Sequence, residues 1–106
     1  MATLQDFKAE LFKAMANPIR IRILEELRTC DGLTVGELQR RVGVEPSNVS
    51  QHLALMRRGG LVTSSREGTS IRYAVANKEL FGLLDVARAI FEKQVDQQAR
   101  LLRADT

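Results

Sequence analysis

Apolar side chains recur every three or four residues along most of the chain, which is the spacing of one face of an α-helix. Asn17-Pro18 separates the first such stretch from the second, because a residue before proline avoids the helical region and Asn-Pro favours a new helix start. The second stretch ends before the turn signal Asp31-Gly32. The pattern predicts two consecutive helices. Their apolar positions are Leu4, Phe7, Leu11, Phe12 and Met15, then Ile19, Ile23, Leu24 and Leu27.

Two further helices are predicted in the middle of the chain. Thr34 and Glu37 have the spacing of a capping box, which opens the third helix. Gly43 interrupts the pattern, and the fourth helix covers 46–58, starting with proline and ending at a pair of glycines. The side chains expected to face the core are Val35, Leu38 and Val42 in the third helix and Val49, Leu53 and Met56 in the fourth.

The pattern then changes to that of a short hairpin followed by a long helix. Residues 61–65 and 70–75 are rich in β-forming side chains and flank a connection at 66–69 that contains glycine. Asn77 is expected to cap a last helix that reaches about Leu102. The predicted order is α-α-α-α-β-β-α, a mainly α (α+β) fold in a single domain spanning 1–106.

Composition narrows the class of protein. A chain of 106 residues with 44% hydrophobic side chains suits one domain, which buries roughly 65% of its unfolded surface on folding. A single cysteine excludes an intrachain disulfide and a Cys-rich zinc module. No apolar run is long enough to span a membrane, so we expect a cytoplasmic protein with no membrane partner. One histidine, one cysteine and no Gly-rich phosphate loop exclude most catalytic constellations.

Positive charge is concentrated in the middle of the chain. Between Gln39 and Tyr73 there are six arginines and two glutamates, a net charge of +4, whereas the rest of the chain carries −1. Arginine suits bidentate contacts with phosphate and guanine. A locally basic face also occurs on small domains that bind no nucleic acid, so charge alone leaves both interpretations open.

Two short helices and a hairpin together describe a helix-turn-helix with a wing. Short or amide side chains begin the helix at 46–58, where they can reach base edges while Val49 and Leu53 hold its other side to the core. The alternative is an ordinary surface helix, since Ser and Asn are common helix caps. The expected DNA contacts are Ser47, Asn48, Ser50, Gln51, His52 and Arg57 in this helix, Arg40 and Arg41 in the helix before it, and Arg66, Thr69 and Arg72 in the wing at 62–75.

Three stretches resemble the ArsR/SmtB family of bacterial winged-helix repressors: LFKAMANPIRIRILEEL, LTVGELQRRVGVEPSNVSQHLALMRRGGLV and VTSSREGTSIRYAV. The resemblance extends from Leu11 to about Ile90. It implies a homodimer built on the first and last helices, binding an imperfect palindrome in double-stranded operator DNA and released by a metal or another signal. The side chains expected in the dimer interface are Leu4, Phe7, Leu11, Leu84, Ala87, Phe91 and Val95.

The metal sites common in that family are not reproduced. Thr34 and Gly36 stand where the cysteines of the third-helix motif would be. On the last helix only Asp85 matches, since Ala87, Gln98 and Leu101 occupy the other ligand positions. We therefore predict no cofactor. The carboxylates Asp85, Glu92 and Asp96 are either a solvated face or a weak site for a hard divalent metal.

The single cysteine and the single histidine can each be interpreted in two ways. Cys30 is either a small apolar filler near a helix end or a redox sensor. For His52 a place beside DNA or in a cap is favoured over metal ligation. The sequence thus predicts a dimeric, sequence-specific DNA-binding regulator, with repression favoured over activation. The alternatives are a winged-helix module for protein–protein interaction without specific DNA binding and, with least support, an enzyme.

Overall fold

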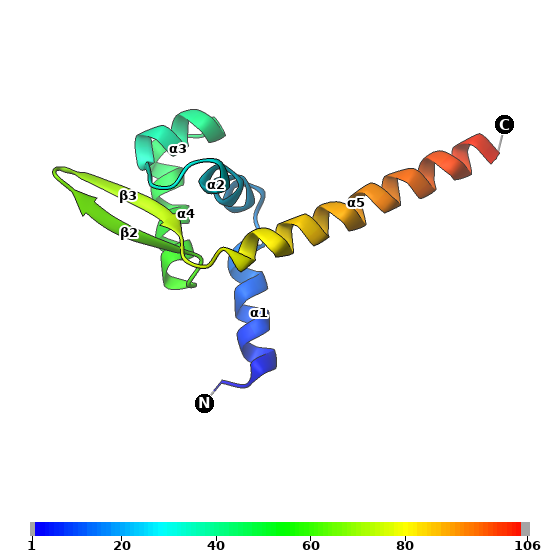
Figure 1. Ribbon diagram of the computed structural model, residues 1–106, viewed down its shortest axis with the longest axis horizontal. Helices are drawn as coiled ribbons and strands as arrows, with labels where there is room; N and C mark the ends of the chain where they lie inside the picture. Colours follow the sequence, from blue (N-terminus) through cyan, green and yellow to red (C-terminus); the bar gives the residue numbers. More distant parts are fainter. Residues whose placement is uncertain (1, 105–106) are drawn as a thin grey trace.

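The computed structural model describes residues 2–104, which form five helices and a small sheet. In Figure 1 the helices α2, α3 and α4 and the sheet gather into one body, here called the head (residues 18–75), while α1 and α5 project from it in different directions. The predicted winged helix-turn-helix fold is confirmed. The elements are α1 (Leu4–Met15), α2 (Pro18–Thr29), β1 (Leu33–Thr34), α3 (Val35–Val42), α4 (Pro46–Arg58), β2 (Val62–Glu67), β3 (Ser70–Val75) and α5 (Glu79–Ala104).

Local capping contacts fix where the helices of the head begin and end. The Asn17 side chain accepts hydrogen bonds from the first backbone N–H groups of α2, as the Asn-Pro signal predicts. Thr34 and Glu37 form the expected capping box of α3. Gly43 ends α3 with φ 78°, in the left-handed region that glycine adopts at little cost. These short-range signals set the turn between α3 and α4.

One apolar cluster at the centre of the head holds these elements together. Val49, Leu53 and Met56 of α4 are fully buried, so the predicted inner face of this helix is confirmed. From α2 and α3 the buried side chains are Ile23, Leu24, Leu27, Leu38 and Val42, while Ile19 and Val35 are half-buried at the edge of the cluster.

The sheet differs from the prediction in two places. The predicted order omitted β1, whose residues Leu33 and Thr34 pair antiparallel with β3. A two-residue strand has no alternation to detect, so pairing with a distant strand is what defines it. The hairpin connection at 66–69 was placed wrongly. Arg66 and Glu67 continue β2, and the turn is Gly68-Thr69 alone, with Gly68 at φ 64° as tight hairpin turns require.

The two terminal helices make the subunit extended. Its radius of gyration is 16.8 Å, whereas a compact domain of this length has about 13 Å. Helix α5 has 26 residues, of which Leu80 is buried, and at 1.5 Å per residue it is about 39 Å long. Among residues 2–104, no helix combines the length and apolarity that crossing a membrane requires. The fold therefore consists of a packed head with two projecting arms.

Replacing Leu53 by alanine should lower the free energy of unfolding by about 2–5 kcal/mol, because it opens a cavity behind α4. Leu55→Ala is the matched control on the same helix, since Leu55 is 45% exposed, and it should cost less than about 1 kcal/mol. Urea unfolding at equal protein concentration measures both. Equal losses would show that the inner face of α4 is wrongly assigned.

Candidate nucleic-acid interface

Helix α4 has two faces with opposite roles. Its inner face is the fully buried stripe of Val49, Leu53 and Met56. Because these three side chains fix the rotation of the helix about its axis, the opposite side faces solvent. Ser47, Asn48, Ser50 and Gln51 are all predicted contacts of α4. All four side chains are exposed to solvent.

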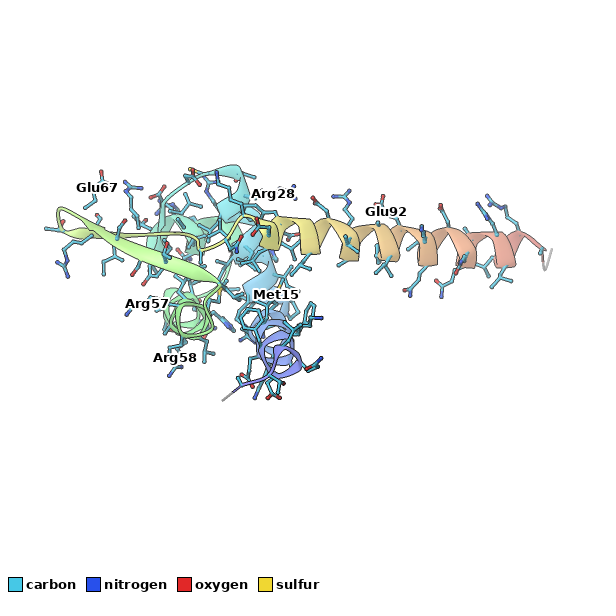
Figure 2. The ribbon with its side chains drawn as sticks, turned by 60° about the horizontal axis from the view of Figure 1, so that its bottom comes forward. Met15, Arg28, Arg57, Arg58, Glu67 and Glu92 are labelled. Atoms are coloured by element: carbon cyan, nitrogen blue, oxygen red, sulfur yellow. The ribbon has the colours of Figure 1, made fainter. Side chains whose placement is uncertain are left out.

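Two arginines extend the outer surface of α4 toward its C-terminal end. In Figure 2, where α4 is seen nearly end-on, Arg57 and Arg58 reach outward from it below the wing (β2 and β3, residues 62–75). Both side chains are exposed. Arg58 was counted in the basic stretch but not assigned to the site. It lies seven residues after Gln51, two helical turns along the same side, and that spacing is the signal for it.

A hollow of about 380 Å³ lies between α4 and the wing. One hydrogen bond joins its two sides, because Arg57 Nη1 donates to Ser64 Oγ on β2 over 3.1 Å. The contact holds the beginning of the wing strand against the end of α4. When a helix and a hairpin lie side by side in this way, the helix can enter a DNA groove while the hairpin contacts the neighbouring DNA backbone. The hollow is lined by Ser50, Leu53, Ala54, Arg57, Arg58 and Tyr73.

Arg72, one of the predicted DNA contacts, connects three parts of the head within the subunit. Its Nη1 donates to the carbonyl of Gly32 over 2.9 Å and lies 3.4 Å from the Glu37 carboxylate, while its Nε lies 3.0 Å from Glu67. The pKa of Glu37 is lowered, first by the hydrogen bonds from Thr34 and then by the charge of Arg72. Arg72 therefore stabilises the junction of α3 with the sheet.

The other predicted wing and α3 residues lie near the ends of their own elements. Arg66 and Thr69 stand at the tip of the wing and are exposed, and Arg40 and Arg41 lie in the last turn of α3. Nη1 of Arg41 lies 3.4 Å from Oε2 of Glu26 on α2. Such partly exposed ion pairs contribute little to stability. The wing-tip side chains are not fixed by the core, so they are able to adjust to a phosphate.

His52, the fifth predicted α4 contact, lies on the flank of the helix and is half-buried. Its Nδ1 is 3.3 Å from Nη1 of Arg20, and Arg20 Nε donates to the carbonyl of Ala14 over 2.7 Å. Arginine can only donate, so Nδ1 is the acceptor and Nε2 carries the proton of the neutral ring. Arg20 thus joins α1, α2 and α4, a role that nothing in its sequence position signals.

The candidate metal ligands on α5 do not form a site. Asp85 accepts two hydrogen bonds from Arg28, at 2.5 and 2.9 Å. Oε1 of Glu92 lies 3.7 Å from Nε of Arg88. Asp96 follows Asp85 by 11 residues, which is about 16 Å along the helix. In the part of the chain that the structure describes, no three His, Cys, Asp or Glu side chains are grouped as metal ligands. The three carboxylates therefore do not lie together as one set of ligands within the described subunit.

Cys30 caps the C-terminal end of α2 and packs half-buried against the core cluster. This is the position expected of a small apolar filler.

The arms α1 and α5 carry most of the exposed apolar surface. Phe7 on α1 is 61% exposed and Phe91 on α5 is 62% exposed. Of the seven predicted interface residues, Leu11 and Leu84 are half-buried because they also pack against the subunit's own core. The other five are exposed: Leu4, Phe7, Ala87, Phe91 and Val95. Exposed apolar surface of this extent marks an interaction site.

Comparison with known proteins identifies relatives of the same architecture. A family model described as a helix-turn-helix domain matches residues 15–65. The HTH-type transcriptional regulator Rv0081 of Mycobacterium tuberculosis is 42% identical over 93% of this chain and 87% of its own. Its crystal structure superimposes with a TM-score of 0.80, covering 93% of this chain and 99% of that one.

Two further proteins add information on assembly and on the sign of regulation. The homodimeric winged helix-turn-helix domain Mb0332 of Mycobacterium bovis, described as a possible ArsR-family regulator, has a TM-score of 0.78 and 28% identity, over 89% of this chain and 86% of that one. The transcriptional repressor PagR of Bacillus anthracis is 35% identical over 77% of this chain and 82% of its own.

Arg66→Ala and Arg72→Ala should have different effects although both remove one charge from the wing. Arg66→Ala should lower the salt dependence of DNA binding, reducing the slope of log K against log salt by about 0.9 for each phosphate no longer neutralised, with no change in melting temperature. Arg72→Ala should lower the melting temperature, because it breaks the contacts with Gly32, Glu37 and Glu67. The reverse pattern would contradict this division.

The pKa of His52 should lie below its ordinary value of 6.5, because burial and then the charge of Arg20 disfavour the imidazolium. The unfolded chain then binds the proton more readily, so the free energy of unfolding should decrease as pH falls from 6.5 to the folded-state pKa, and then level off. NMR titration is unambiguous because the chain has one histidine. His52→Asn should abolish this part of the pH dependence, and a pKa above 6.5 would contradict the assignment.

Proposed function

The chain belongs to the ArsR/SmtB family of winged helix-turn-helix transcriptional regulators, and we propose that it acts as a homodimer on an imperfect palindrome in double-stranded operator DNA. The proteins similar to it are transcriptional regulators, so it is a DNA-binding regulator and neither an enzyme nor a winged helix used only for protein assembly. In the proposal α4 reads base edges in the major groove.

The two faces of α4 carry this proposal. Ser50 and Gln51 stand on its exposed side within the first half of the helix, which is the half that enters the groove in helix-turn-helix proteins. Hydroxyl and amide groups can hydrogen-bond to base edges, and Gln is suited to adenine. Arg57 and Arg58 at the other end of α4, with Arg66 in the wing, are placed to contact phosphates, which position the protein without specifying sequence.

A homodimer explains the two arms. The exposed apolar side chains of α1 and α5 give a two-fold interface in which the same surface on each subunit contacts the other. Such symmetry relates the two copies of α4, so each reads one half-site, and half-sites in helix-turn-helix operators lie about one turn of DNA apart. An imperfect palindrome is the sequence that matches this symmetry.

Repression is the sign of regulation that we propose. A dimer bound to an operator that overlaps a promoter would exclude polymerase, and the relative PagR is named as a repressor. Since the regulator acts where the DNA is, we expect it in the cytoplasm.

Phe91→Glu should dissociate the dimer, because it places a charge in the apolar face of α5. Sedimentation of the wild type should give twice the 11.9 kDa of one chain at micromolar concentration. The matched control is Ala89→Glu, which adds the same charge on the opposite side of α5 and should leave the dimer intact. A monomeric wild type would contradict the proposed assembly.

Ser50→Ala combined with Gln51→Ala should weaken binding to the operator by about 1–3 kcal/mol for each good base-edge hydrogen-bonding pair that is removed. Binding to a random duplex should change little, because it depends on phosphates. Fluorescence anisotropy on an operator selected from a random pool, and on a scrambled duplex, separates the two effects. Gln5→Ala, an exposed glutamine on α1, is the control. Equal weakening on both duplexes would remove α4 as the reading element.

A further inference from the structure

A charged contact joins the base of α5 to the head. Arg28, in the last turn of α2, donates from Nη1 and Nη2 to the two carboxylate oxygens of Asp85, at 2.5 and 2.9 Å. The same guanidinium lies over the ring of Phe81, with its Cζ 5.3 Å from the ring centroid. The carboxylate and the ring together hold the guanidinium in place. Figure 2 shows Arg28 at the point where α5 leaves the head.

This contact lies at the end of the part of α5 that packs against the head. Leu80 is buried and Leu84 is half-buried against the core, so the beginning of α5 rests on the head. Past Asp85 nearly all side chains of the helix are exposed in the subunit. Packing near its start fixes where α5 begins but holds its direction weakly, since a short contact is a poor restraint on the angle of a long helix.

We propose that the contact of Arg28 with Asp85 and Phe81 sets the angle between α5 and the head, and thereby the spacing of the two half-sites that the dimer prefers. The inference rests on the proposed function, since it requires that α5 joins the two subunits. Arg28 and Asp85 are positioning residues in this scheme, and neither contacts DNA.

Geometry favours a directional role over a stabilising one. The two side chains are 47% and 56% exposed, and exposed ion pairs contribute little to stability. A bidentate arginine–carboxylate pair nevertheless restricts orientation, because both donors must face both acceptors. The hydrogen bonds raise the pKa of Arg28 and lower that of Asp85, so the pair stays charged at all ordinary pH values.

The length of α5 amplifies small changes at this contact. From Asp85 to the end of the helix at Ala104 is about 28 Å at 1.5 Å per residue. A rotation of about 10° at the base moves the far end by about 5 Å, more than the roughly 3.4 Å between successive base pairs. A contact that restricts this rotation therefore selects among half-site spacings that differ by one base pair.

The test measures preference for spacing in the full-length protein. A two-fold operator is first selected by the wild type from random duplexes, and its half-sites are then moved apart or together in steps of one base pair. The wild type should bind one spacing best. Arg28→Ala and Asp85→Asn should each reduce the ratio between the best spacing and its neighbours by about two- to fivefold, the range expected when an exposed, oriented pair is removed. The double variant should show no larger reduction than either single one, because both remove the same contact.

Glu92→Gln is the matched control. It removes the exposed pair with Arg88 on the same helix and should keep the wild-type preference. Asp85→Asn keeps the side-chain shape at an exposed position, so the test stands if Arg28→Ala fails to fold. Equal weakening at every spacing, with unchanged ratios, would overturn the inference, as would additive reductions in the double variant. Failure of the wild type to select any two-fold duplex would instead contradict the proposed function.

Discussion

Burial of one face of α4 is the constraint on which the other features of the molecule depend. Val49, Leu53 and Met56 are removed from solvent within the core cluster that α4 shares with α2, α3 and the sheet, at a gain of roughly 2 kcal/mol for each such side chain. A helix fixed in rotation by its apolar stripe has no freedom in what it shows to solvent. The outer face, with Ser50 and Gln51, is therefore a consequence of core packing and needs no separate means of orientation.

The arginines of the central stretch divide into two groups once the fold is formed. Arg72 joins α3 to the sheet through Glu37 and Glu67, whereas Arg57 donates one hydrogen bond to Ser64 of the wing and remains exposed. Arg58 stays exposed at the end of α4, and Arg66 stays exposed at the tip of the wing. The net charge of the stretch overstates the number of side chains able to contact phosphates, because part of it stabilises the scaffold that presents the rest.

The parts of the fold that the sequence predicts correctly are those fixed by neighbouring residues. The Asn17 cap, the Thr34 capping box and the apolar stripe of α4 all follow from spacings of a few positions. Contacts between distant positions leave no such trace. Arg20 and His52 are 32 residues apart in the sequence, and Arg28 and Asp85 are 57 apart. These two pairs, like strand β1, can be identified only from the folded structure.

The central claim is that two copies of α4 read successive major grooves on one side of the duplex. Dimethyl sulfate protection tests it directly, because the reagent methylates the N7 of guanine in the major groove. On a duplex selected by the protein, we expect two protected clusters about 10–11 base pairs apart, and loss of both clusters in the Phe91→Glu variant. Protection of a single cluster by the intact dimer, or strong binding with every guanine N7 accessible, would contradict the account.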